Sequence, residues 1–169
     1  MNKRPAKKVA FLGLLFALAL VLSVVEAAIP VSGILPMGVK PGLSNIVTMY
    51  AVFYMGYGEA FSIAILKSLF VFITRGAVAA LMSVSGGVFS VLVMFLLLLP
   101  KRKLSYLVIS VSGSIVHNLA QLTAASFLLG KDALYYTPVL VISGALMGVL
   151  TGLLLRSVLP ALGRLRNRF

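Results

Sequence analysis

The chain has 169 residues, of which 61% are hydrophobic and only 11% are charged, whereas soluble domains carry about 25% charged residues. This composition excludes an ordinary water-soluble globular protein. The length suffices for several bilayer spans of about 20 residues each, but not for a separate catalytic domain as well. With no cysteine, one histidine and three acidic residues, the sequence excludes disulfides, thiolate metal sites and most acid-base chemistry. We therefore expect one membrane domain over residues 1–169, with no metal, no cofactor and no catalytic residue.

The net charge of +12 comes from basic residues that gather between the apolar stretches. They cluster at residues 3–8, 101–103 and 156–168. Cytoplasmic loops of membrane proteins carry such an excess of Lys and Arg, whereas a nucleic-acid-binding protein presents its basic residues as a patch or stripe. The pattern predicts a multi-pass protein of the bacterial cytoplasmic membrane, with both termini in the cytoplasm and no nucleic-acid partner.

Apolar runs predict an all-α integral membrane protein with six transmembrane helices, an even number that returns the chain to the cytoplasm. The runs cover residues 9–28, 43–57, 60–73, 77–99, 104–129 and 134–159. Between the first two, residues 29–42 hold three prolines and three glycines. This segment fits a re-entrant or lid-like connection better than a regular helix.

Two alternatives to this topology follow from the same runs. The first run has a basic start and ends in small residues, which also describes a cleavable signal peptide. The runs at 43–57 and 60–73 are short, so a four-span protein would use them as a hairpin that does not cross the bilayer. The length of the first run and the apolar runs behind it favour six spans.

Two cations fall within or at the edge of the third run. Lys67 lies near its middle, where a charged side chain costs roughly 2.5 to 3.5 kcal/mol unless it faces water or a partner. Arg75 follows on nearly the same side of the helix, because two helical turns take about 7.2 residues. Both are candidate ligand-binding residues. The alternatives are a salt bridge from Lys67 to Glu26 or Glu59, and a guanidinium of Arg75 that only snorkels to the interface.

The fifth run carries a polar face. His117 and Gln121 are four residues apart, with Ser114 and Asn118 alongside. Each residue alone fits hydrogen bonding between helices as well as it fits ligand contact, but four together favour a binding face. The topology places further polar residues in the same extracytoplasmic half, where cations outnumber acids, so we expect an anionic or acceptor-rich ligand. The predicted substrate-binding residues are Glu26, Lys40, Asn45, Lys67, Arg75, His117, Asn118 and Gln121.

Small residues form smooth stripes on two of the expected helices, and such stripes let helices pack closely. The stripe of the first helix consists of Ala6, Ala10, Gly13 and Ala17. It begins at the cytoplasmic end, among lysines, where docking of another membrane protein fits. Gly144, Gly148 and Gly152 form two GxxxG steps in the last helix. For these we favour packing inside the bundle over oligomerisation.

Three segments carry a resemblance to a known family. They read VEAAIP at residues 25–30, VKPGLSNIV at 39–47 and VHNLAQ at 116–121. In these segments the chain resembles the Gx transporter family, which is also called heptaprenyl diphosphate synthase component I. The resemblance covers most of the chain, although Pro41 and Ser44 stand where that family's pattern has Leu and Ala. The family is in turn similar to the S components of energy-coupling factor transporters, which are six-helix membrane proteins of about this size.

The resemblance implies a substrate-binding membrane subunit of an uptake transporter. Its cargo would be a small anionic or amphipathic molecule such as a vitamin, a quinone or an isoprenoid precursor. By the same resemblance the stripe of the first helix docks onto a transmembrane T component with cassette ATPases, within the membrane lipid. Residues 29–42 would close over the ligand.

Two other functions compete with this one. The chain is alternatively the non-catalytic membrane component I of a heptaprenyl diphosphate synthase in menaquinone or isoprenoid synthesis. It lacks the aspartate-rich DDxxD pattern that a catalytic prenyl-transferring subunit needs. A third hypothesis is a structural membrane subunit whose polar residues only join helices.

Overall fold

The computed structural model describes residues 3–28, 43–99 and 104–168. Within them the chain is helical and contains no strand, as the sequence predicts. The elements are α1 (Lys3–Ala28), α2 (Asn45–Tyr54), α3 (Tyr57–Arg75), α4 (Ala77–Leu98), α5 (Tyr106–Leu129), a 3₁₀ helix η1 (Lys131–Tyr136) and α6 (Thr137–Arg168).

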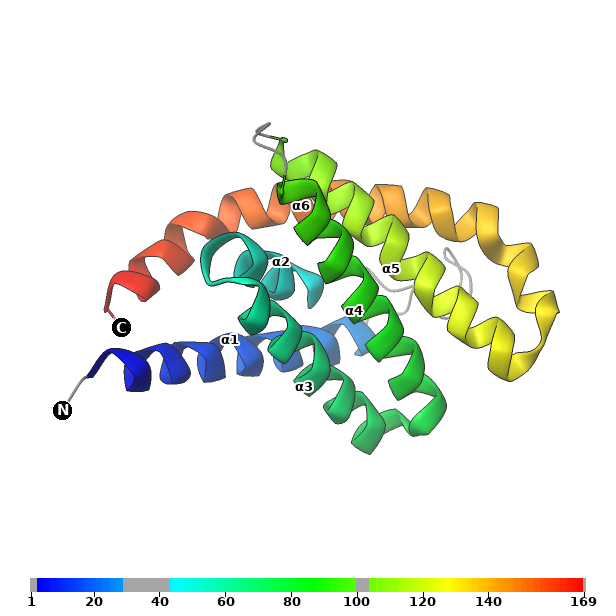
Figure 1. Ribbon diagram of the computed structural model, residues 1–169, viewed down its shortest axis with the longest axis horizontal. Coiled ribbons are helices and arrows are strands. Elements are labelled where there is room, and N and C mark those ends of the chain that lie inside the picture. Colours follow the sequence, from blue (N-terminus) through cyan, green and yellow to red (C-terminus); the bar gives the residue numbers. More distant parts are fainter. Residues whose placement is uncertain (1–2, 29–42, 100–103, 169) are drawn as a thin grey trace.

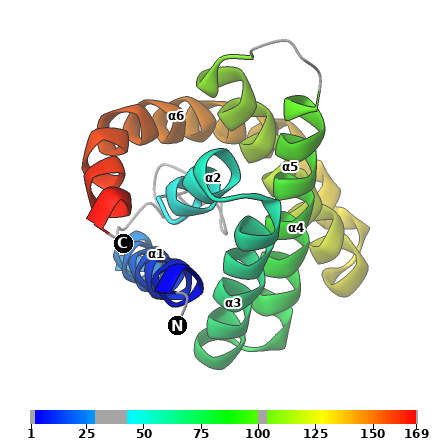
Figure 2. The same cartoon turned by 60° about the vertical axis from the view of Figure 1, so that its left-hand side comes forward.

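The long helices surround the short helix α2. Helix α5 packs between α4 and α6, and α3 packs along α4 (Figure 1). Figure 2 shows α2 at the centre of this arrangement, and it contacts α1, α3, α4 and α6. The first turns of α1 and the last turns of α6 lie at the same end of the molecule in both views.

Five helices are long and apolar enough to cross a membrane: α1, α3, α4, α5 and α6. Helix α2 has 10 residues, which makes it about 15 Å long against a hydrocarbon core of about 30 Å. The second expected span, residues 43–57, is therefore a short helix, and the structure leaves six complete spans as a prediction. Large apolar side chains are exposed along the five long helices, which is what helices in contact with lipid require.

The core is built around α2 and the inner face of α1. Seven consecutive residues of α2, from Ile46 to Val52, are buried, because this helix has neighbours on all sides. On α1 the buried side chains recur every four residues at Phe11, Leu15 and Ala19, which is one face of a helix. An ion pair between Lys8 and Glu59 also joins α1 to α3.

Glycines set the close approach of α6 to α5. A Cβ placed on Gly148 would lie 2.5 Å from Cα of Val111, and one on Gly144 would lie 3.1 Å from Cα of Ile115. The hydroxyl of Ser110 donates a 2.7 Å hydrogen bond to the carbonyl oxygen of Gly148 across the same contact. The GxxxG steps of α6 therefore pack inside the bundle.

Candidate functional site

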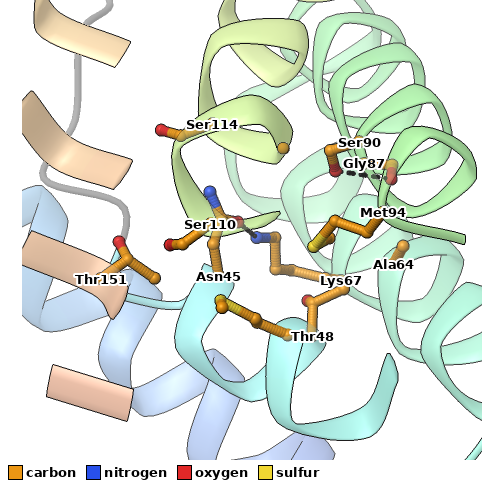
Figure 3. A pocket seen from close by; sticks show the side chains of 12 residues that line it. Asn45, Thr48, Ala64, Lys67, Gly87, Ser90, Met94, Ser110, Ser114 and Thr151 are labelled. Carbon is orange, nitrogen blue, oxygen red and sulfur yellow. Dashed lines mark hydrogen bonds between the residues drawn. The ribbon is translucent and has the colours of Figure 1, made fainter. Parts of the chain in front are cut away.

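The buried lysine of α3 holds the start of α2. Lys67 is only 7% exposed, and its Nζ donates hydrogen bonds to Oγ of Ser44 at 3.0 Å and to Oδ1 of Asn45 at 2.9 Å. Figure 3 shows its side chain crossing from α3 to Asn45. The charge in the middle of an apolar helix is thus supplied with acceptors from a neighbouring helix, as a charged group in a membrane requires.

A cavity of about 270 Å³ opens next to this lysine, and we call it the polar cavity. It brings together six of the eight predicted site residues, from α2, α3 and α5. Among the described residues that line it, two are cationic and none is acidic. The six predicted residues are Asn45, Lys67, Arg75, His117, Asn118 and Gln121.

His117 and Gln121 reach the polar cavity because α4 has a glycine beneath them. A Cβ on Gly86 would lie 2.7 Å from Cγ of Gln121 and 2.9 Å from Cε1 and Nδ1 of His117. The Nδ1 atom of His117 is buried and has no hydrogen-bond partner within residues 3–28, 43–99 and 104–168. The neighbouring Gly87 allows close packing of α4 against α3, because an added Cβ there would lie 3.2 Å from Cβ of Ala64.

Arg75 and Asn118 occupy different surroundings in the same cavity. Arg75 is the last residue of α3 and is exposed, so its guanidinium belongs to the rim. Asn118 donates a 3.1 Å hydrogen bond from Nδ2 to the carbonyl oxygen of Leu140 on α6. The bond that Asn118 makes is the helix-to-helix bond that the sequence left open as an alternative to ligand contact.

The two other predicted site residues lie at the edges of the described structure. Lys40 falls outside the described residues, and Glu26 belongs to α1 but its side chain is not described. Of the two acids weighed as partners of Lys67, Glu59 forms its ion pair with Lys8.

Several residues of the polar cavity were missed because they are small or apolar. Ser23 is the last described residue of the buried face of α1 and also lines the polar cavity. In the sequence it is marked only by its position, four residues after Ala19 on that face. Ser44 directly precedes Asn45, and its hydroxyl oxygen accepts a hydrogen bond from Lys67. Val71 and Met82 also line the cavity. Their side chains are apolar, so a search for polar residues in apolar helices does not find them.

The small-residue stripe of α1 faces away from the bundle. Ala6, Ala10, Gly13 and Ala17 are all exposed, and a Cβ on Gly13 would meet no atom within 4 Å. The opposite face of α1, with Phe11 and Leu15, is the buried one. The predicted docking stripe is therefore accessible, and its use as a docking surface stays a prediction.

Comparison with known proteins identifies the family. Neither the curated proteins nor the solved structures contain a match to this chain. One family, described as heptaprenyl diphosphate synthase component I, matches residues 15–158. Because this match spans most of the chain, the protein belongs to the heptaprenyl diphosphate synthase component I family.

Proposed function

We propose that this protein captures a small anionic or amphipathic molecule in the polar cavity, as the substrate-binding membrane subunit of an uptake transporter. The observation that carries the proposal is Lys67, a buried cation held at the wall of a cavity within a helical bundle. An intramembrane charge of this kind is expensive and marks a ligand pathway more often than a structural position.

The lining of the polar cavity supports an anionic ligand. Lys67 and Arg75 supply positive charge, while His117 and Gln121 supply groups that donate hydrogen bonds. Lys67 also lies at the start of α2, where the helix dipole adds positive potential. A carboxylate or phosphate in the cavity would relieve the repulsion between these groups.

The volume of the cavity supports a compact ligand. About 270 Å³ lies at the lower end of small-molecule pockets, which run from about 300 to 1,000 Å³. A vitamin-sized molecule, or the head group of a larger amphipathic one, suits this space better than a long prenyl chain does.

The exposed stripe of α1 supports a membrane partner. Small residues at a helix surface let another helix approach closely, and Ala6, Ala10, Gly13 and Ala17 present such a surface outward. We propose a transmembrane T component with cassette ATPases as that partner.

The family name favours a second function. A component I would be a non-catalytic membrane partner of a prenyl diphosphate synthase, and a cationic cavity also suits a diphosphate head group. The two functions differ in their partners, which are ATPases in one case and a soluble prenyltransferase in the other.

Isolation from the native membrane separates the two functions. The tagged full-length protein is extracted in a gentle detergent, and mass spectrometry identifies the proteins and small molecules that accompany it. We expect a T component, cassette ATPases and one retained anionic or amphipathic molecule. Recovery of a prenyltransferase without any ATPase would contradict the transporter proposal and support the second function.

A further inference from the structure

A second, much smaller space adjoins the polar cavity. This small chamber has a volume of about 20 Å³. Asn45, Lys67 and Ser114 line both spaces, so these residues form the partition between them. Figure 3 shows the chamber, with Ser110 and Thr151 on the side toward α5 and α6.

Five hydroxyl groups from four helices line the small chamber. Ser90 donates to the carbonyl oxygen of Gly87 at 2.9 Å, and Ser110 donates to that of Gly148 at 2.7 Å. Because both hydroxyl protons are already used in these hydrogen bonds, the two oxygens can only accept hydrogen bonds from a molecule in the chamber. The remaining three hydroxyls make no hydrogen bond within the described part of the chain, and they belong to Thr48, Ser114 and Thr151.

Hydroxyl groups in a protein interior are normally hydrogen-bonded, to protein or to ordered water. A site holds a water molecule when it offers at least about 10–15 Å³ and two to four polar partners. The small chamber meets both conditions. We propose that it is a binding site for a single water molecule, which lies against Lys67 on the side away from the polar cavity.

The chemistry of the chamber favours water over a cation. No acidic residue is among the described residues that line it, and the positively charged Lys67 is part of its wall. A sodium ion would meet that positive charge without a compensating carboxylate. A water molecule instead donates to the acceptor oxygens of Ser90 and Ser110 and accepts from Lys67 or a threonine.

This water adds a contact to those that Lys67 already makes with Ser44 and Asn45, and the added contact does not depend on the ligand. A charged lysine inside a membrane is stable only when it faces water or a partner. The water site adds such a contact from within the bundle, whether or not the polar cavity is occupied. The inference concerns the wall of the cavity and holds for either function proposed above.

X-ray radiolysis of the full-length protein in lipid nanodiscs tests this site directly. Radiolysis converts a bound water molecule to a hydroxyl radical, which oxidises the methionine sulfur next to it. Met49 and Met94 line the chamber and are only 2% and 5% exposed. We expect both to be oxidised, and we expect the same of Met82, which lines the polar cavity.

A matched pair of variants checks the assignment. Thr151→Ile fills the chamber and removes a hydroxyl, so labelling of Met49 and Met94 should be lost while that of Met82 is retained. Thr151→Ser keeps the hydroxyl and should keep the labelling. Absence of labelling at both methionines in the unaltered protein would show a dry chamber and overturn the proposal, even if the isoleucine variant does not fold. Labelling that changes when sodium is replaced by a large organic cation would overturn water as the occupant.

Discussion

The ammonium group of Lys67 on α3 donates a 2.9 Å hydrogen bond to Oδ1 of Asn45, the first residue of α2. Among the described residues, the only α-helix too short to span a bilayer is therefore fixed at its start by the most buried lysine. This bond connects the position of α2 with the wall of the polar cavity. A ligand that draws Lys67 toward itself competes with Asn45 for the same ammonium group.

Lys67→Ala should weaken ligand binding by about 10- to 150-fold while the protein stays folded. A charge-assisted hydrogen bond contributes about 1.5–3 kcal/mol, and each 1.4 kcal/mol is about tenfold in affinity. The measurement is the affinity for the small molecule that is retained on purification, with thermal unfolding in detergent as the check on folding. Lys131→Ala, at an exposed position on η1, is the matched control and should bind normally. Unchanged affinity in the Lys67 variant would place the ligand elsewhere.

Gly148→Ala should destabilise the bundle strongly. Its Cβ would lie 2.5 Å from the backbone Cα of Val111, so α5 and α6 must separate to admit it, and overpacking of this kind costs typically about 1–3 kcal/mol. Thermal unfolding of the purified protein in detergent measures the change.

Gly163→Ala is the control on the same helix. Nothing lies within 4 Å of an added Cβ there, so only helix propensity acts, and alanine favours a helix over glycine by about 0.8–1.0 kcal/mol. We expect Gly163→Ala to unfold at the same or a higher temperature. Equal unfolding temperatures for the two variants would contradict the close contact of α6 with α5.

Gly86→Ala should reduce ligand affinity more than it reduces stability. Its Cβ would lie 2.7 Å from Cγ of Gln121 and 2.9 Å from the ring of His117. These are side-chain atoms, which can rotate away into the polar cavity, whereas backbone atoms cannot. The volume and the donors available to the ligand change as a result. Affinity and unfolding temperature are measured on the same preparation, and a variant that loses only stability would argue against a binding role for this face.

The sequence locates the helices because apolar length is a strong signal, but it places their ends poorly. The expected run 77–99 agrees closely with α4, Ala77–Leu98. The run 60–73 misses the ends of α3, because Glu59 and Arg75 are charged yet still helical. The run 43–57 overstates α2, because Gly56 with φ of 133° ends the helix while the sequence remains apolar. Hydropathy indicates whether a segment lies in lipid or in water. The residue at which a helix ends is set by backbone conformation and hydrogen bonding.

The polar cavity was predictable to the extent that its residues share a helix. Spacing alone places His117 and Gln121 on one face of α5, and in the structure both line the polar cavity. Their role in binding a ligand stays a prediction. What lies opposite them depends on how helices cross. Local spacing puts Ser23 on the buried face of α1, but it does not show that Ser23 reaches this cavity or that Gly86 lies beneath His117. Packing between helices supplies this information.

Asn118 and Gln121 should respond differently to the loss of their amides. Asn118→Ala removes the hydrogen bond to the carbonyl oxygen of Leu140, and such bonds between membrane helices contribute about 0.6 kcal/mol on average. We expect a small loss of stability. Gln121→Leu keeps the size of the side chain and should instead lower ligand affinity. If Gln121→Leu proves neutral for binding, its amide joins helices and the third, structural hypothesis gains support.

A bulky residue on the outward stripe of α1 should separate partner docking from ligand capture. Gly13 has open space around it, so Gly13→Leu adds a side chain without disturbing the bundle, but it prevents a second helix from approaching closely. We expect co-purification of the membrane partner to be lost while ligand affinity and unfolding temperature are retained. Val9→Leu, also exposed on α1 and already large, is the control and should keep the partner. If the partner still co-purifies with Gly13→Leu, the docking surface lies on another helix, because no close helix contact can form over the leucine.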